Sequence, residues 1–201
     1  MVRPSVSYDL EWPVRLNVHR TKLTEEQFIL LCQENPELRL ELTAEKELVI
    51  MPPTGSEGGW RSGEVFYSLT AWAKQDGKGL SFDSSTGFTL PNGAIRSPDA
   101  SWIRGERWTA LTKAQREKFA PICPDFVIEV RSQTDKLPDL LDKMHEYIAN
   151  GARLGWLIDP LEKRAYIYRP GHVVETLENP EALSGAPELP GFVLLVQALW
   201  A

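Results

Sequence analysis

The chain has 201 residues, 42% hydrophobic and 25% charged, a composition typical of a globular protein and not of a disordered one. The length fits a single domain over residues 1–201, with a core that needs no disulfides. The net charge of −6 weighs against broad non-specific binding to nucleic acid, but allows a local basic groove around an acidic metal site. Because no apolar run could span a bilayer and the N-terminus lacks a signal-peptide core, we expect a cytoplasmic protein without a membrane partner.

The N-terminal third predicts a helix, a hairpin and a second, longer helix. Thr24 and Gln27 form a capping-box pattern, which predicts a helix over 24–35. Leucines alternate with polar residues in "LRLEL", and a charged turn separates them from "LVIM", so a hairpin is expected over 38–53. The glycine-rich "TGSEGG" then leads into a helix predicted over about 60–75 by the spacing of its apolar residues.

The middle of the chain alternates short strands with helices. Strands are expected as a pair in "LSFDSSTGFTLPNG" and singly in "RSPDASWIRG" and "DFVIEVRS", with a small polar helix at "TKAQREKF". The clearest helix runs from about 137 to 150, where five apolar residues share one face and Gly151 stands at the cap position. "LGWLIDP" predicts a buried strand after it, with "KRAYIYRPG" as its hairpin partner. This order predicts an α/β fold with a crossover helix between parallel strands.

The C-terminal tail reads as a loop, "ENPEALSGAPELPG", closed by an apolar segment. The apolar "GFVLLVQALWA" and the prevalence of two-fold assemblies lead us to expect a homodimer. The alternative is that this segment completes the core of its own chain.

Two carboxylates stand in or beside segments that otherwise read as core strands. Asp99 follows Pro98 at the start of one strand, and Glu129 interrupts the apolar "FVIEV" of another. Side chains alternate along a strand, so Glu129 and Arg131 share a face, and a surface ion pair between them is one interpretation. For Asp99 alone, a turn residue bonded to its own backbone is the simpler interpretation.

The pair of carboxylates indicates more than either residue does alone. If the two strands are neighbours, Asp99 and Glu129 can converge, and a bound cation would remove the cost of burying their charge. Two carboxylates with open positions suit Mg²⁺, which takes oxygen ligands and keeps several waters. Such an ion supplies the chemistry that phosphodiester hydrolysis needs.

"SPD", with "EVR" thirty residues later, resembles the PD-(D/E)XK nuclease motif, with Arg131 in place of the usual lysine. The wider text resembles the Uma-two family of restriction-endonuclease-like proteins, over roughly residues 20–170: "RLELTAEKELVIMPPTG", "FDSSTGFTLPNGAIRSPDASWI", "PDFVIEVRSQTDKL" and "KMHEYIANGARLGWLIDP". The resemblance implies a restriction endonuclease-like fold, with a mixed central sheet flanked by helices and an N-terminal helix and hairpin extension. It also implies a divalent metal, Mg²⁺ or Mn²⁺ as its substitute, and cleavage of DNA.

The missing lysine is the departure from the superfamily pattern. Arg131 can stabilise transition-state charge, but with a pKa above about 12 it cannot act as a base. The family often carries its lysine on the following helix, and Lys143 matches that place. The alternative for Lys143 is an exposed ion pair with Asp139 on a solvent-facing side of the helix.

Two further acidic residues are candidate metal ligands by the same resemblance. Glu64 lies on the helix before the core strands, where the superfamily often has an additional carboxylate, and Glu41 in "LELT" matches a recurrent acidic position of the family. A solvated surface charge is the alternative for each. The sequence therefore predicts a Mg²⁺-dependent DNA endonuclease in which Asp99 and Glu129 hold the metal. The alternative is an inactive nuclease-fold module for DNA binding or self-association.

Overall fold

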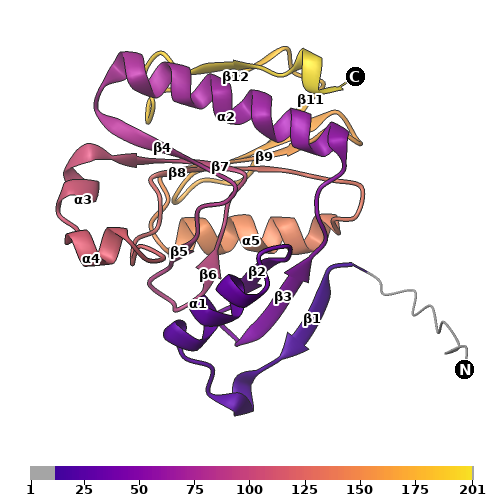
Figure 1. Cartoon of the computed structure of the whole chain (residues 1–201). Helices are drawn as coiled ribbons and strands as arrows, with labels where there is room; N and C mark the ends of the chain where they lie inside the picture. The colour runs from indigo at the N-terminus through magenta and orange to yellow at the C-terminus, as the bar shows by residue number, and fades with distance from the viewer. Residues whose placement is uncertain (1–11, 201) are drawn as a thin grey trace, which may run out of the picture.

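The computed structural model describes residues 12–200 (Figure 1). The helices are α1 Glu25–Glu34, α2 Ser56–Asp76, α3 Gly105–Thr109, α4 Lys113–Arg116 and α5 Leu137–Ala149, with short 3₁₀ turns at His19–Thr21 and Gln197–Trp200. The strands are β1 Val14–Asn17, β2 Arg39–Leu42, β3 Glu47–Met51, β4 Gly79–Asp83, β5 Phe88–Thr89, β6 Ile95–Arg96, β7 Ala100–Arg104, β8 Phe126–Val130, β9 Leu154–Asp159, β10 Arg164–Tyr168, β11 Glu175–Glu178, β12 Ala182–Ser184 and β13 Val193–Leu195.

A six-stranded mixed sheet of order β11-β10-β9-β8-β7-β4 forms the centre. Only β8 and β9 pair in parallel, and α5 is the crossover that joins them, as the sequence predicts. β7 pairs antiparallel with β8, with Ala100 opposite Ile128. Continuing this register by one residue places Asp99 opposite Glu129. The two strands that carry the candidate carboxylates are therefore neighbours.

The two faces of this sheet are covered by different helices (Figure 1). Phe126 and Ile128 of β8 pack in one core cluster with Leu69 of α2, whereas Val127 packs in a second cluster with Met144 of α5. Side chains alternate along β8, so Glu129 follows Val127 onto the α5 face. All five residues of β8 are buried, which is expected of a strand covered on both faces.

The three strands of the N-terminal extension, together with β5 and β6 from the middle of the chain, form a five-stranded antiparallel sheet, β1-β3-β2-β6-β5, on the same side of the central sheet as α5 (Figure 1). The capping box is present: Thr24 accepts a hydrogen bond from the Gln27 backbone, and the Gln27 side chain accepts one from the Thr24 backbone. Phe28 of α1 then packs on the leucines of β2. The helix and hairpin expected here are confirmed, and their docking brings β2 alongside α5.

Several local predictions differ from the structure. The tail expected as a loop contains β12, which pairs with β13 of the closing apolar segment, because Leu183 and Leu194 of these strands pair with each other in the core cluster on the α2 face. α2 begins at Ser56, one turn earlier than predicted, with Gly55 in extended geometry as its N-cap residue. The two strands expected in residues 80–93 belong to different sheets. Within residues 12–200, no helix combines the length and apolar character that crossing a membrane requires.

The closing apolar segment is part of the core of its own chain. Phe192, Val196 and Trp200 are buried in the cluster beneath α2. Val193 and Leu195 alternate with them and stay exposed, at 54% and 73%. The buried half of the segment that motivated the dimer prediction is therefore used inside the chain.

Candidate active site

Asp99 and Glu129 line the same cavity, of about 550 Å³, at the ends of β7 and β8. The Val130 backbone N–H donates to Asp99 Oδ2 at 2.8 Å, which fixes the Asp99 carboxylate against the residue that follows Glu129. The Asp99 side chain is 12% exposed and that of Glu129 is 6% exposed. A surface ion pair between Glu129 and Arg131 is therefore wrong as an interpretation, and so is a local turn role for Asp99.

Lys143 reaches into this site from the middle of α5. Its Nζ lies 2.8 Å from Glu129 Oε1 and 2.8 Å from Glu41 Oε1, and its side chain is only 11% exposed. The expected alternative, an exposed pair with Asp139, is wrong, because Asp139 instead accepts a hydrogen bond from Arg15 at 2.9 Å. The lysine thus stands where the family resemblance implies, as a bridge between two carboxylates.

Tyr147 is a member of the site that the sequence reasoning missed. Its hydroxyl donates to Glu129 Oε1 at 3.0 Å, and the residue is fully buried. Both this bond and the Lys143 contact use Oε1, and neither uses Oε2. The signal was available, because Tyr147 follows Lys143 by four residues and so shares its helix face.

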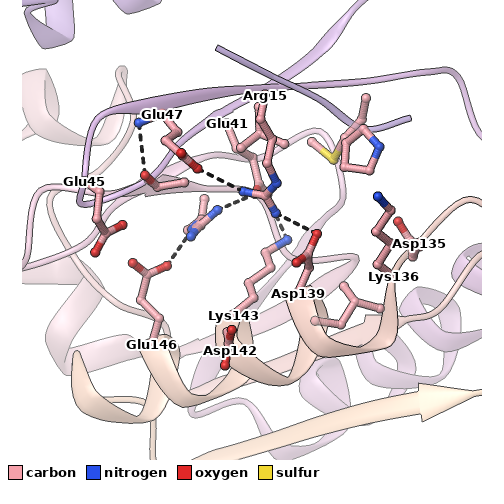
Figure 2. Close-up of a pocket in the computed structure, with 16 residues that line it drawn as sticks. Arg15, Glu41, Glu45, Glu47, Asp135, Lys136, Asp139, Asp142, Lys143 and Glu146 are labelled. Atoms are coloured by element: carbon pink, nitrogen blue, oxygen red, sulfur yellow. Dashed lines mark hydrogen bonds and ion pairs between the residues drawn. The ribbon is translucent and has the colours of Figure 1, made fainter. Parts of the chain in front are cut away.

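Glu41 belongs to a second group of charges on the other side of Lys143 (Figure 2). Its Oε1 accepts from Lys143 and from the Ser97 backbone N–H at 2.9 Å, and its Oε2 accepts from Arg96 at 3.1 Å. Arg96 also binds Glu146 at 2.6 Å. Both oxygens of Glu41 are engaged by the protein. Glu41 lines a separate cavity of about 510 Å³.

The two carboxylates that share Lys143 have opposite pKa shifts. Burial raises the pKa of Glu129 to about 7, since Lys143 only partly opposes it and Asp99 and Glu41 add negative charge. Burial acts in the same direction on Glu41, but Lys143 and Arg96 together outweigh it and lower the pKa of Glu41 to about 2. Burial also raises the pKa of Asp99, which Arg39 opposes from nearby. Asp99 and Glu129 are the carboxylates left with too little positive charge.

Arg131 is placed differently from the sequence expectation. Its backbone N–H still donates to the Ile158 carbonyl of β9 at 2.9 Å, one residue beyond the end of β8. Its guanidinium donates to Asp159 Oδ2 at 2.8 Å, and Asp159 is fully buried at the end of β9. Arg131 is not among the residues that line the cavity of Asp99 and Glu129. Its part in catalysis stays a prediction that this geometry does not favour.

Glu64 is exposed on α2 and lies outside the lining of this cavity. The wall that α2 contributes comes from its first two turns, including Glu57 and Arg61, which form an ion pair at 2.6 Å. Because α2 begins at Ser56, Glu64 stands a further turn along the helix. The structure therefore brings together Asp99, Glu129 and Lys143 in one cavity, joins Glu41 to them through Lys143, and leaves Glu64 and Arg131 apart.

The donor set at this cavity suits a hydrated hard cation. Among residues 12–200, no three or more His, Cys, Asp and Glu side chains are grouped as a complete metal site would require. The site instead offers two carboxylates. In the contacts described above, Glu129 Oε2 takes no part, and Asp99 Oδ1 has the Arg39 guanidinium at 3.7 Å. Mg²⁺ binds in this way, through one or two carboxylates and several waters. The residues present fit that ion.

Comparison with known proteins gives the family. The model of the Uma2 family, described as "Putative restriction endonuclease", matches residues 25–197, so the chain belongs to this family. Its structure is similar to the crystal structure of "a putative nuclease belonging to DUF820 from Anabaena variabilis ATCC 29413", with a TM-score of 0.67 and 22% sequence identity over 80% of this chain and 89% of that chain. At this identity the likeness shows the fold alone, which is restriction endonuclease-like. No curated protein matches the chain.

Proposed function

We propose that this protein is a Mg²⁺-dependent endonuclease that hydrolyses phosphodiester bonds in DNA. The observation that carries the proposal is the convergence of two buried carboxylates, Asp99 and Glu129, in one cavity with Lys143 bonded to Glu129. Membership of a family described as restriction endonucleases supports DNA as the substrate. Asp99 and Glu129 would hold the ion, and Mn²⁺ would substitute for Mg²⁺.

When bound, Mg²⁺ would supply Lewis-acid stabilisation of the phosphoryl oxygens and lower the pKa of a coordinated water. The remaining roles belong to the chain's own residues. Lys143 is held between Glu41 and Glu129, so its ammonium group offers a fixed positive charge in the cavity. Tyr147 restrains the Glu129 carboxylate through Oε1. Glu41 acts in this proposal by positioning Lys143, since its own oxygens are already bonded.

The test compares the wild-type protein with Asp99→Asn on supercoiled plasmid DNA in Mg²⁺, Mn²⁺ or chelator. We expect metal-dependent cleavage and a metal-induced rise in melting temperature in the wild type, because a ligand of the native state stabilises it by mass action. Both should be lost in Asp99→Asn. Asp142→Asn is the matched control, because Asp142 is exposed, adjoins Lys143 and lines only the second cavity.

A wild-type protein with neither metal-dependent cleavage nor a metal-induced shift would favour the alternative, a nuclease fold kept for DNA binding or self-association. The homodimer and the cytoplasmic location stay predictions. Light scattering on the concentrated protein tests the first of them.

A further inference from the structure

Arg39 stands at the edge of the proposed active site, although it was not among the candidate residues named from the sequence. It begins β2, two residues before Glu41. It lines the cavity of Asp99 and Glu129 and also a smaller cavity of about 200 Å³, and Asp99 and Thr54 line both. The guanidinium is therefore placed where two hollows meet beside Asp99.

The contacts of Arg39 are loose for an arginine beside a buried carboxylate. Its Nη2 lies 3.7 Å from Asp99 Oδ1, which is too long for a hydrogen bond, and its Nη1 lies 3.4 Å from Thr54 Oγ1. Arg131, by contrast, reaches its carboxylate at 2.8 Å. A third of the Arg39 side chain, 33%, is exposed. A guanidinium has five N–H donors, so this group keeps most of its capacity to bind an anion.

We propose that Arg39 binds the phosphodiester group of the substrate beside the cation held by Asp99 and Glu129. The inference rests on the proposed function. The planar fork of a guanidinium matches two oxygens of a phosphate, which an ammonium group cannot do. A cation on Asp99 would also offset the negative charge that now attracts Arg39, and would leave the guanidinium to the incoming phosphate.

Charge neutralisation of Asp99 is the simpler role for Arg39, and the geometry argues against it. A neutralising partner would be expected at charge-assisted hydrogen-bond distance, near 2.8 Å. The two roles also predict opposite effects on metal binding. Removing a true partner would damage the site, whereas removing a nearby competing cation would strengthen the binding of a metal ion.

The experiment uses Arg39→Ala and Arg39→Lys in the full chain. Mn²⁺ affinity is measured by calorimetry on the protein alone. Binding to a labelled 30-base-pair duplex is measured by fluorescence anisotropy in Ca²⁺ over a range of salt concentrations, with cleavage checked on the same duplex. For Arg39→Ala we expect Mn²⁺ to bind about threefold tighter or more, since a repelling charge is gone. DNA should bind roughly tenfold weaker or more, as for the loss of one charge-assisted hydrogen bond.

The salt dependence identifies the contact. Losing one phosphate contact on duplex DNA lowers the slope of log affinity against log salt by about 0.9. Arg39→Lys should keep the salt slope of the wild type, because the positive charge remains. It should bind DNA less tightly than the wild type, because the planar fork of the guanidinium is lost. Arg15→Ala is the matched control: Arg15 lies on β1 with 37% of its side chain exposed, and lines only the second cavity.

Each outcome decides the proposal. A wild-type slope in Arg39→Ala overturns it even if the affinity falls. Weaker Mn²⁺ binding together with a lower melting temperature assigns Arg39 a structural role and also overturns it. A wild-type protein that binds neither Mn²⁺ nor DNA overturns this inference and the proposed function together, whereas a wild-type protein that cleaves with an unaffected Arg39→Ala overturns the inference alone.

Discussion

The two sides of Lys143 differ in how completely their buried carboxylate is compensated. On one side Glu41 has Lys143, Arg96 and the Ser97 backbone N–H, and its pKa falls to about 2. On the other side Glu129 has only a share of the same lysine and the Tyr147 hydroxyl, and burial raises its pKa to about 7. One side is a completed ion-pair network, and the other is a site with room for another cation.

Burial of a carboxylate is therefore not itself the mark of function in this protein. Asp125 lies just before β8 and is as buried as Glu129, with 3% and 4% of the whole residue exposed. Asp125, however, forms an ion pair with Arg107 at 2.9 Å and accepts a hydrogen bond from the Arg104 backbone N–H at 3.0 Å. What distinguishes Glu129 is an incomplete set of partners at the wall of a cavity. Such a combination is a physical reason to expect a ligand.

The largest effect is expected from removing the charge that joins the two sides. Lys143→Met keeps the aliphatic stem but deletes the ammonium group, so metal-dependent cleavage should fall by about two to three orders of magnitude, as for other preorganised charges. Mn²⁺ should still bind, because both carboxylates remain. Turnover on plasmid DNA and calorimetric Mn²⁺ titration measure the two effects.

Lys74→Met on the exposed face of α2 is the control for this substitution. If Lys143→Met cleaves at the wild-type rate, the catalytic charge belongs to another residue, and Arg39 and Arg131 become the candidates. If Lys143→Met loses Mn²⁺ binding as well, the lysine organises the carboxylates and is not a separate catalytic charge.

A smaller effect, on stability, is expected from breaking the completed side. Glu41→Gln removes the charge that both Lys143 and Arg96 face, and breaking a buried ion pair by removing one partner typically costs about 3 kcal/mol or more of the free energy of unfolding. Urea denaturation measures it. Glu45→Gln is the control, since Glu45 is exposed on the wall of the cavity that Glu41 also lines (Figure 2). A change below about 0.5 kcal/mol, the usual range for surface substitutions, would mean that the network contributes little.

The sequence predicted the elements that carry the active site better than the contacts between them. The apolar spacing of residues 137–150 placed Lys143 on a helix after β8, and the apolar run around Glu129 indicated a buried strand. Pro98 and Asp99 before a second strand completed the pair. These features are local, because strand and helix periodicity is visible within a few residues.

The contacts that the sequence did not predict join segments far apart along the chain. Lys143 and Glu41 are separated by 102 positions, and Arg96 and Glu146 by 50. They meet because the N-terminal sheet docks beside α5, and hydrophobic periodicity does not specify how two sheets dock. Arg131 was misplaced because its guanidinium binds Asp159 of the neighbouring strand β9, a contact that alternation along β8 alone does not specify. Glu64 was assigned by position on a helix whose first turn lies earlier than predicted.

The smallest expected effect, when it is counted per pH unit, is the pH dependence of stability on the side that lacks a cation. The pKa of Glu129 is raised from its ordinary value of 4.5 to about 7, so the folded protein binds a proton there more tightly than the unfolded chain does. This contribution to stability is fully present below pH 4.5 and is lost as the pH rises through 7. Glu41 has the opposite sign, since its pKa is lowered to about 2, so its contribution is lost only as the pH falls below 4.5.

The pH dependence of stability between pH 4.5 and 7 therefore reports on Glu129. The charged or titratable groups that face Glu129 are Lys143 and Tyr147 of α5, Glu41 of β2, and Asp99. In chelator, the free energy of unfolding of the wild type should fall across this window by at most about 1.4 kcal/mol per pH unit, relative to Glu129→Gln. Gln preserves the shape of the side chain and cannot ionise. Parallel curves for the two proteins would show that Glu129 is already compensated in the absence of metal. The contrast between the two sides of Lys143 would then be lost, and with it the electrostatic reason to expect a cation at Asp99 and Glu129.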